Sequence, residues 1–254
     1  MVHLKVVTSS LEKGARAACG TAVIVDVYRA FSCTTLFFSL GVDSVLLMGS
    51  PEEAFAYREK NPEALLAGEK EGLPIAGFDL PNSPSWILNQ PPGYFKGRKV
   101  VQRTSSGVQG ALLALEGAER VFLASYLNAR ATARAVKAMN PQMVHIVAMG
   151  RQMKEPSPED EWCAKYLKHL LGAGGYSHLE ALREILWSPE TQKFLKGDKS
   201  HYPREDPLVC LQLDLLDLAL AAKKEKEWVV VRPQAPVSPG EPAESFGEAS
   251  HQDP

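Results

Sequence analysis

The feature that most constrains the fold is the alternation of short, continuously apolar runs with amphipathic segments. Runs rich in Val, Ile and Leu predict strands at 3–9, 21–29, 44–49, 64–69, 98–105, 120–127 and 143–150. Because these runs are apolar throughout, rather than apolar at every second residue, each strand is expected to be covered on both faces, as in parallel sheets.

Helical segments with recognisable starts lie between these strands. In the predicted helix 50–60, Ser50 is the expected N-cap and Glu53 completes a capping box. The segment 157–172 repeats this design with Asp160 in the position of Glu53, and 128–140 opens on an asparagine. Strands joined by single helices require right-handed crossovers, so we predict an α/β fold with a mostly parallel or mixed sheet flanked by helices.

The second half of the chain is expected to be more helical. Helices are predicted at 177–197 and along the apolar run 206–222, followed by a late strand at 228–231, placed at the sheet edge. Residues 1–232 are interpreted as one α/β domain, with a division near residue 155 as the alternative.

The last segment, 233–254, is rich in Pro, Ser and Glu and has few apolar residues. Such a composition cannot bury enough surface to offset the entropy of ordering, so a disordered tail is predicted.

Composition narrows the class of partner. The net charge of −2 offers no broad field for nucleic acid or membranes, which favours a small-molecule partner. The four cysteines form no CxxC pair, and the chain shows neither a signal-peptide pattern nor an apolar run long enough to cross a bilayer. We therefore expect a cytoplasmic protein. The oligomeric state stays open, because the 206–222 segment suits a homodimer as well as a core.

Candidate catalytic groups collect where the predicted strands end, the edge at which open α/β sheets bind ligands. Asp26 and Arg29 end one strand, Glu69 ends another, and Arg151 follows a third. An acid in an apolar strand is costly unless it is paired or bound to metal, so Asp26 either forms a salt bridge with Arg29 or serves as a nucleophile or Mg²⁺ ligand. Mg²⁺ prefers carboxylate and phosphate oxygens, and Glu69 would supply a second carboxylate.

Two loops extend this candidate site. The segment 67–84 holds Asn82 and Ser83 between glycines and prolines, which indicates a fixed, irregular path. At 102–115 a strand breaks into a turn before a helix, where free N–H groups bind anions. The polar residues of that turn are Arg103, Thr104, Ser105 and Ser106, followed by Gly107. An ordinary serine N-cap is the alternative interpretation.

Asp160 is a third candidate carboxylate, although its capping-box position explains it without catalysis. The sequence contains no HxH or HExxH spacing, no P-loop, no GxGxxG after a strand and no GxSxG. These absences argue against a zinc enzyme, a P-loop NTPase, a dinucleotide-dependent dehydrogenase and an α/β-hydrolase.

Taken in order, these motifs resemble the 2-phosphosulfolactate phosphatase family. The matching segments are "IVDVYRAFSCTT", "LLAGEKEGLPIAGFDLPNSP", "RTSSG", "SYLNA", "SPEDEWCA" and "REDPLVCLQLDLLDLAL".

The resemblance implies a Mg²⁺-dependent phosphatase, of the kind associated with coenzyme M biosynthesis, that acts on a phosphate ester of a small sulfonated or carboxylated acid. It places Asp26, Glu69, Asn82, Ser83, the 104–107 turn and Asp160 around the site. We expect Mg²⁺ between Asp26 and Glu69, with Arg29, Arg103 and Arg151 among the anion-binding groups. The alternatives are a phosphatase of another small phospho-acid and a non-catalytic binder of an acidic metabolite.

Overall fold

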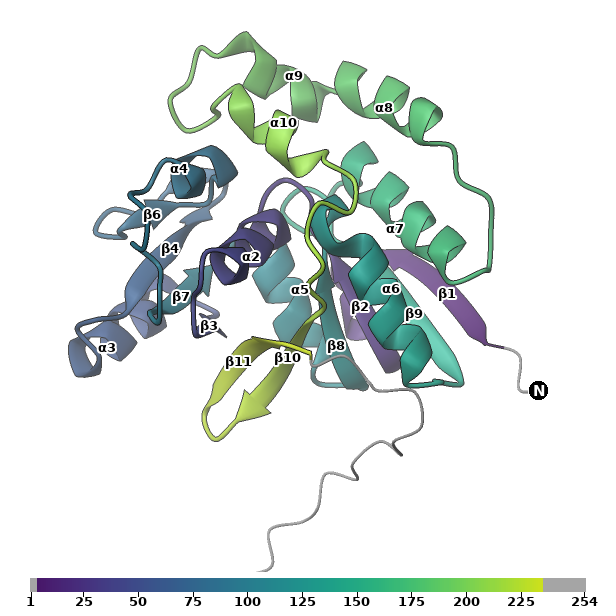
Figure 1. Ribbon diagram of the computed structural model, residues 1–254, viewed down its shortest axis with the longest axis horizontal. Helices are drawn as coiled ribbons and strands as arrows, with labels where there is room; N and C mark the ends of the chain where they lie inside the picture. The colour runs from purple at the N-terminus through teal and green to yellow at the C-terminus, as the bar shows by residue number, and fades with distance from the viewer. Residues whose placement is uncertain (1–3, 235–254) are drawn as a thin grey trace, which may run out of the picture.

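The computed structural model describes residues 4–234, in which helices flank one eleven-stranded mixed sheet (Figure 1). The strands are β1 (Lys5–Ser10), β2 (Gly20–Val25), β3 (Ser44–Leu47), β4 (Leu65–Lys70), β5 (Leu73–Pro74), β6 (Leu80–Pro81), β7 (Lys99–Arg103), β8 (Ala118–Ala124), β9 (Met143–Ala148), β10 (Leu220–Glu225) and β11 (Trp228–Pro233). The helices are α1 (Leu11–Arg16), α2 (Ala30–Ser39), α3 (Pro51–Lys60), α4 (Pro84–Leu88), α5 (Gly107–Ala114), the short 3₁₀ helix η1 (Tyr126–Asn128), α6 (Ala129–Ala138), α7 (Pro158–Leu170), α8 (His178–Trp187), α9 (Pro189–Lys196) and α10 (Glu205–Cys210). The predicted α/β fold and each strand predicted from an apolar run are confirmed.

The sheet consists of two parallel blocks joined by an antiparallel hairpin. Its order is β1-β9-β2-β8-β10-β11-β3-β7-β4-β5, with β6 paired to β4. Strands β1, β9, β2 and β8 run parallel to one another, as do β3, β7 and β4. The hairpin β10–β11 pairs antiparallel with β8 on one side and with β3 on the other. The end of the chain therefore connects the two halves of the sheet.

This arrangement corrects the predicted place of the late strand. The strand predicted at 228–231 exists as β11, but it lies inside the sheet and not at its edge. Val230 packs with the cluster under α3, and Val231 packs on the opposite face with α2 and α5. An apolar side chain on each face suits an interior strand, which is covered on both sides.

The single helix predicted at 206–222 is wrong. Helix α10 ends at Cys210, and the chain then crosses α6 in an irregular path before β10 begins. The backbone N–H groups of Asp214 and Leu216 donate to the carbonyl oxygens of Tyr126 and Leu127, at 2.8 and 2.9 Å. The apolar side chains of the segment pack into two clusters on opposite faces of the sheet, which one helical stripe could not do.

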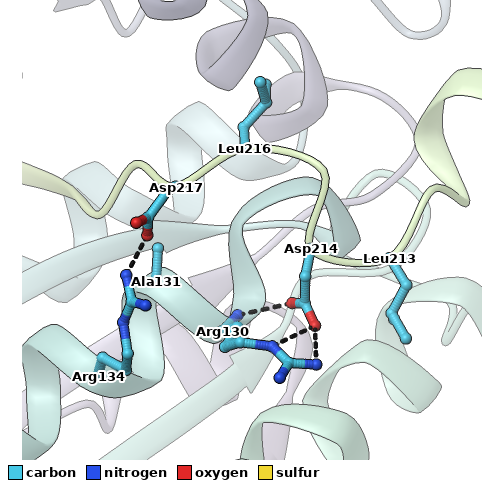
Figure 2. Close-up of a pocket in the computed structure, with 7 residues that line it drawn as sticks. All are labelled: Arg130, Ala131, Arg134, Leu213, Asp214, Leu216 and Asp217. Atoms are coloured by element: carbon cyan, nitrogen blue, oxygen red, sulfur yellow. Dashed lines mark hydrogen bonds and ion pairs between the residues drawn. The ribbon is translucent and has the colours of Figure 1, made fainter.

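Charged pairs fix this crossing segment over α6, around a surface hollow of about 410 Å³ (Figure 2). Arg130 donates from its backbone N–H and its Nε to Asp214, at 2.8 and 2.9 Å, and Arg134 pairs with Asp217. Because these arginines are already paired with the segment's own carboxylates, the hollow has a structural explanation.

The two faces of the sheet are covered by different helices. In β2, Ile24 packs with residues of α1, α2 and α5, whereas Val25 packs with residues of α6, α7 and α8. Successive residues of a strand point to opposite faces of the sheet, so β2 is buried on both of its faces. Helices α8, α9 and α10 lie along one end of the molecule, next to α7 and α4 (Figure 1).

Twist explains how the ends of both blocks can approach one another. In a flat sheet the antiparallel hairpin would make β2 and β4 run in opposite directions. These two strands, however, are separated by six steps from one strand to its neighbour. At roughly 20–25° of twist per step, the blocks are rotated by about 120–150°, which turns their carboxyl ends toward the same side. Figure 1 shows α2 between the two blocks, directly after the end of β2.

No helix within residues 4–234 is long and apolar enough to cross a membrane. The predicted tail at 233–254 falls almost wholly outside the described residues.

Candidate active site

One backbone corner, where β7 passes into α5, receives two carboxylates from different strands. The N–H of Ser105 donates to Oε1 of Glu69 at 2.5 Å, and the N–H of Gly107 donates to Oδ2 of Asp26 at 2.7 Å. The turn expected to offer free N–H groups to an anion therefore directs at least two of them to the protein's own acids. It also brings the exits of β2, β4 and β7 together.

Asp26 follows β2 directly and is buried. Its Oδ1 accepts from the N–H of Ala30 at 2.9 Å, which fixes the carboxylate at the start of α2. Burial raises the pKa of Asp26 to about 6; the backbone N–H groups of Ala30 and Gly107 oppose that shift, and the charge of Glu69 adds to it. The suggested Asp26–Arg29 salt bridge is absent, since Arg29 pairs with Asp206 instead.

Glu69 is held by the turn that follows it as well as by the corner. Its Oε2 accepts from the N–H of Gly72 at 2.5 Å, and Arg103 donates to its backbone carbonyl at 2.8 Å. The preceding Gly68 has φ of 150°, and a Cβ there would lie 1.9 Å from the carbonyl oxygen of Arg103. Only glycine allows β4 to approach β7 this closely, so the Gly-Glu pair has a steric cause.

Asp160 does not cap its helix. Ser157 precedes α7 without a side-chain cap hydrogen bond, and Asp160 accepts instead from the N–H groups of Val27 and Gly150, at 2.7 and 2.8 Å. The capping-box explanation is therefore wrong. Asp160 ties the exits of β2 and β9 together. Burial, and then the charges of Asp26 and Glu159, raise its pKa well above the usual range.

These exits surround a polar cavity of about 300 Å³. Of the residues predicted from the sequence, the cavity is lined by Asp26, Arg29, Glu69, Asn82, Ser105, Ser106 and Arg151. Residues that were not predicted also line it, among them Tyr28, Glu159, Glu190, Lys193, Lys199 and Tyr202. Acidic and basic side chains thus face one space from both parallel blocks and from α9.

The other predicted residues lie around the cavity without lining it. Thr104 accepts from the N–H of Val108 at 3.2 Å and so starts α5. Arg103 supports Glu69 and Ser105, and Ser83 donates to Asp206 at 2.8 Å. The hydrogen bonds of these side chains fix the segments that surround the cavity.

Arg29 and Asp206 form a buried ion pair at 2.7 Å. Arg29 also donates to the carbonyl oxygen of His201 at 3.0 Å, and its guanidinium lies over the rings of Phe194 and Tyr202. Asp206 was not predicted from the sequence, because its partners lie far away along the chain.

Glu159 was also missed, although it stands beside Asp160 in the acidic first turn of α7. It is 3% exposed, and its Oε2 has no hydrogen-bond partner. Asn82 Oδ1 is likewise buried and without a partner. Unpaired buried oxygens are costly, so two of them on one cavity indicate a site prepared for a ligand.

The side-chain oxygen atoms of Asp26, Glu69 and Asn82, which line the cavity, are ligands of the kind that a hard cation such as Mg²⁺ prefers. Among residues 4–234, no group of three or more His, Cys, Asp and Glu side chains could hold a metal ion by itself. Mg²⁺, however, is commonly held by one or two carboxylates and completes its shell with water and substrate phosphate. Asp26, Glu69 and the unpartnered Asn82 Oδ1 fit that mode of binding.

Comparison with known proteins supports the family resemblance seen in the sequence motifs. A family model described as 2-phosphosulpholactate phosphatase matches residues 7–225. Relatives from several bacteria carry the name "Probable 2-phosphosulfolactate phosphatase". The Bacillus subtilis protein is 32% identical over 81% of this chain and 88% of its own length. The Deinococcus radiodurans protein is 40% identical over 51% of this chain and 52% of its own length. The Thermus thermophilus protein is 32% identical over 78% of this chain and 76% of its own length. The chain therefore belongs to the 2-phosphosulpholactate phosphatase family of phosphoric monoester hydrolases.

Proposed function

We propose that the protein hydrolyses a phosphate monoester of a small sulfonated or carboxylated acid with the help of Mg²⁺. The observation that carries the proposal is the corner at Ser105–Gly107, which fixes Asp26 and Glu69 at one cavity. A substrate with a phosphate and a second acidic group is small enough for a space of about 300 Å³. The names of the relatives support the same substrate class.

Asp26 and Glu69 would hold the metal ion, which supplies a Lewis acid that neutralises phosphate oxygens as their charge shifts in the transition state. Arg29 and Arg151 line the cavity, each also paired with a carboxylate of the protein, and would orient the dianionic ester through the guanidinium N–H groups that Asp206 and Glu155 leave free. Because both oxygens of Asp26 accept backbone N–H groups, the carboxylate keeps its position before substrate arrives.

Either Asp26 or Asp160 would attack phosphorus or activate water. Asp26 lines the cavity, whereas Asp160 does not line it and accepts from the backbone N–H groups of Val27 and Gly150. This difference supports Asp26 as the group that reaches the substrate, with Asp160 positioning the ends of β2 and β9.

The test is phosphate release from 2-phosphosulfolactate, 2-phospholactate and phosphoglycolate, each with and without EDTA. We expect turnover that EDTA abolishes, and its loss in Asp26→Asn. Asp217→Asn removes a carboxylate of an exposed pair outside the cavity and is the matched control. Turnover only on phosphoglycolate would favour another small phospho-acid. Thermal stabilisation by these esters without turnover would favour a binding protein and contradict the proposal. The cytoplasmic location, the homodimer and the link to coenzyme M stay predictions.

A further inference from the structure

The carboxyl group of Glu159 lies in the cavity wall with an unused oxygen. It belongs to the first turn of α7, is 3% exposed, and lines the cavity together with Asp26 and Arg29. Within residues 4–234 its Oε2 has no hydrogen-bond partner, although the nearby hydroxyl of Ser157 lowers the pKa of the carboxyl group. A buried carboxyl oxygen left unpaired in a polar cavity is placed to make its hydrogen bond with a bound molecule.

Charged and titratable groups from neighbouring elements face this carboxyl. Glu190 and Lys193 of α9 form an ion pair in the same cavity wall. The Nε atom of Arg151 lies 3.7 Å from Oε1 of Glu190. Tyr28, which follows β2, and Asp160, the next residue in α7, are also within electrostatic reach. Glu159 thus shares one cavity with the carboxylate of Asp26 and with a paired anion and cation on α9.

We propose, on the basis of the proposed phosphatase function, that Glu159 is the general acid that protonates the leaving oxygen of the ester. The attacking oxygen forms a bond to phosphorus, and the bond from phosphorus to the ester oxygen breaks, with its electron pair staying on that oxygen. The proton of Glu159 passes to this oxygen and the alcohol leaves. When water supplies the attacking oxygen, the proton that it loses restores the acid form of Glu159. When Asp26 supplies it, a water molecule then hydrolyses the phosphorylated carboxylate and loses the same proton. The products of both routes are inorganic phosphate and the alcohol.

The protonation state agrees with this role. Burial raises the pKa of Glu159 to about 7; the carboxylate of Glu190 raises it and the ammonium group of Lys193 lowers it. A general acid works best when its pKa lies near the operating pH. The acid form is active, so activity should decline as pH rises through this pKa.

The first test compares two substrates that differ by two hydrogen atoms, 2-phospholactate and phosphoenolpyruvate. The alkoxide of lactate is a poor leaving group and needs a proton, whereas the enolate of pyruvate is a better one. In Glu159→Gln we expect kcat on phospholactate to fall by about 10²-fold or more, with a much smaller loss on phosphoenolpyruvate. The alkaline decline of the wild-type pH profile should disappear. A role in folding alone would lower both rates by the same factor and keep the decline.

The second test uses the neighbours and does not depend on how Glu159→Gln folds. Glu190→Gln removes a negative charge, so the alkaline decline should move to lower pH. Lys193→Met removes a positive charge, so the decline should move to higher pH. Equal losses on both substrates in Glu159→Gln, or shifts of the same sign in the two neighbour variants, would overturn the assignment of Glu159. No phosphate release by the wild-type protein from any ester would instead overturn the proposed function itself, and the inference with it.

Discussion

Asp206 accepts a hydrogen bond from the guanidinium of Arg29 at 2.7 Å although 177 residues separate the two along the chain. Neither side chain is more than 5% exposed. The same carboxylate accepts from the hydroxyl of Ser83 and from the N–H of Ser85, at 2.8 and 2.9 Å. One buried carboxylate of α10 therefore joins the start of α2 to the loop that precedes α4, and so fixes one wall of the cavity.

Asp206→Ala should destabilise the protein strongly, because it leaves the Arg29 charge buried without its partner. We expect a loss of about 3–5 kcal/mol in the free energy of unfolding, measured by urea denaturation. Asp217→Ala removes an exposed pair with Arg134 and should change stability by less than about 1 kcal/mol. Equal stabilities for the two variants would show that Arg29 does not depend on Asp206.

Gly107→Ala should disable the site by displacing Asp26. A Cβ at position 107 would lie 2.7 Å from Oδ2 of Asp26 and 2.8 Å from its Cβ, so the carboxylate must move. We expect kcat to fall by about 10²-fold, as misplaced catalytic groups commonly cause. At Gly175 an added Cβ meets nothing within 4 Å, so Gly175→Ala is the control and should keep wild-type kcat. Full activity in Gly107→Ala would mean that Asp26 tolerates displacement.

The parts of the site that the sequence predicted are those set by local signals. Asp26 and Glu69 each follow a short apolar run, and a strand end is where the backbone leaves the sheet and side chains become free for ligands. The turn at 104–107 has the Gly and hydroxyl residues of a strand-to-helix corner. What the sequence could not specify was the partner of each group: the N–H groups of that turn bind the two carboxylates.

The parts that were missed depend on packing between distant segments. Nothing near Asp206 marks it as the partner of Arg29. Asp160 fits a local capping pattern, but its carboxylate accepts instead from the N–H groups of Val27 and Gly150, which come together because β2 and β9 are side by side. The 206–222 run shows the same limit, since continuous apolar character does not distinguish a helix from an extended segment that serves two faces.

Mg²⁺ should stabilise the wild-type protein, and Glu69→Gln should reduce that effect. A ligand present at a hundred times its dissociation constant adds about 2.7 kcal/mol to the free energy of unfolding. The measurement is thermal unfolding during a MgCl₂ titration, followed by reversal with EDTA. Asp79→Asn is the matched control, because Asp79 lies on the same loop but pairs with Arg58 outside this cavity. If MgCl₂ stabilises Glu69→Gln against thermal unfolding as much as it stabilises the wild-type protein, Glu69 is not one of the metal ligands.

Glu159→Gln should become more stable than the wild-type protein as pH rises. Burial raises the pKa of Glu159 from 4.5 in the unfolded chain to about 7 in the folded protein. The folded state therefore binds the proton more tightly, and the stability present below pH 4.5 is lost as pH rises through 7. The neutral amide lacks this loss. From pH 4.5 to pH 8, the free energy of unfolding of the variant relative to wild type should rise by about 3 kcal/mol, measured by urea denaturation in EDTA.

The control for this pH dependence is Glu180→Gln, which removes an exposed carboxylate from the first turn of α8. Its free energy of unfolding should stay within about 0.5 kcal/mol of wild type at both pH values, as is usual for surface substitutions. A gap between Glu159→Gln and wild type that is the same at pH 4.5 and pH 8 would contradict a raised pKa at Glu159. In that case the carboxylate is ionised at neutral pH and cannot hold the proton that the leaving oxygen needs.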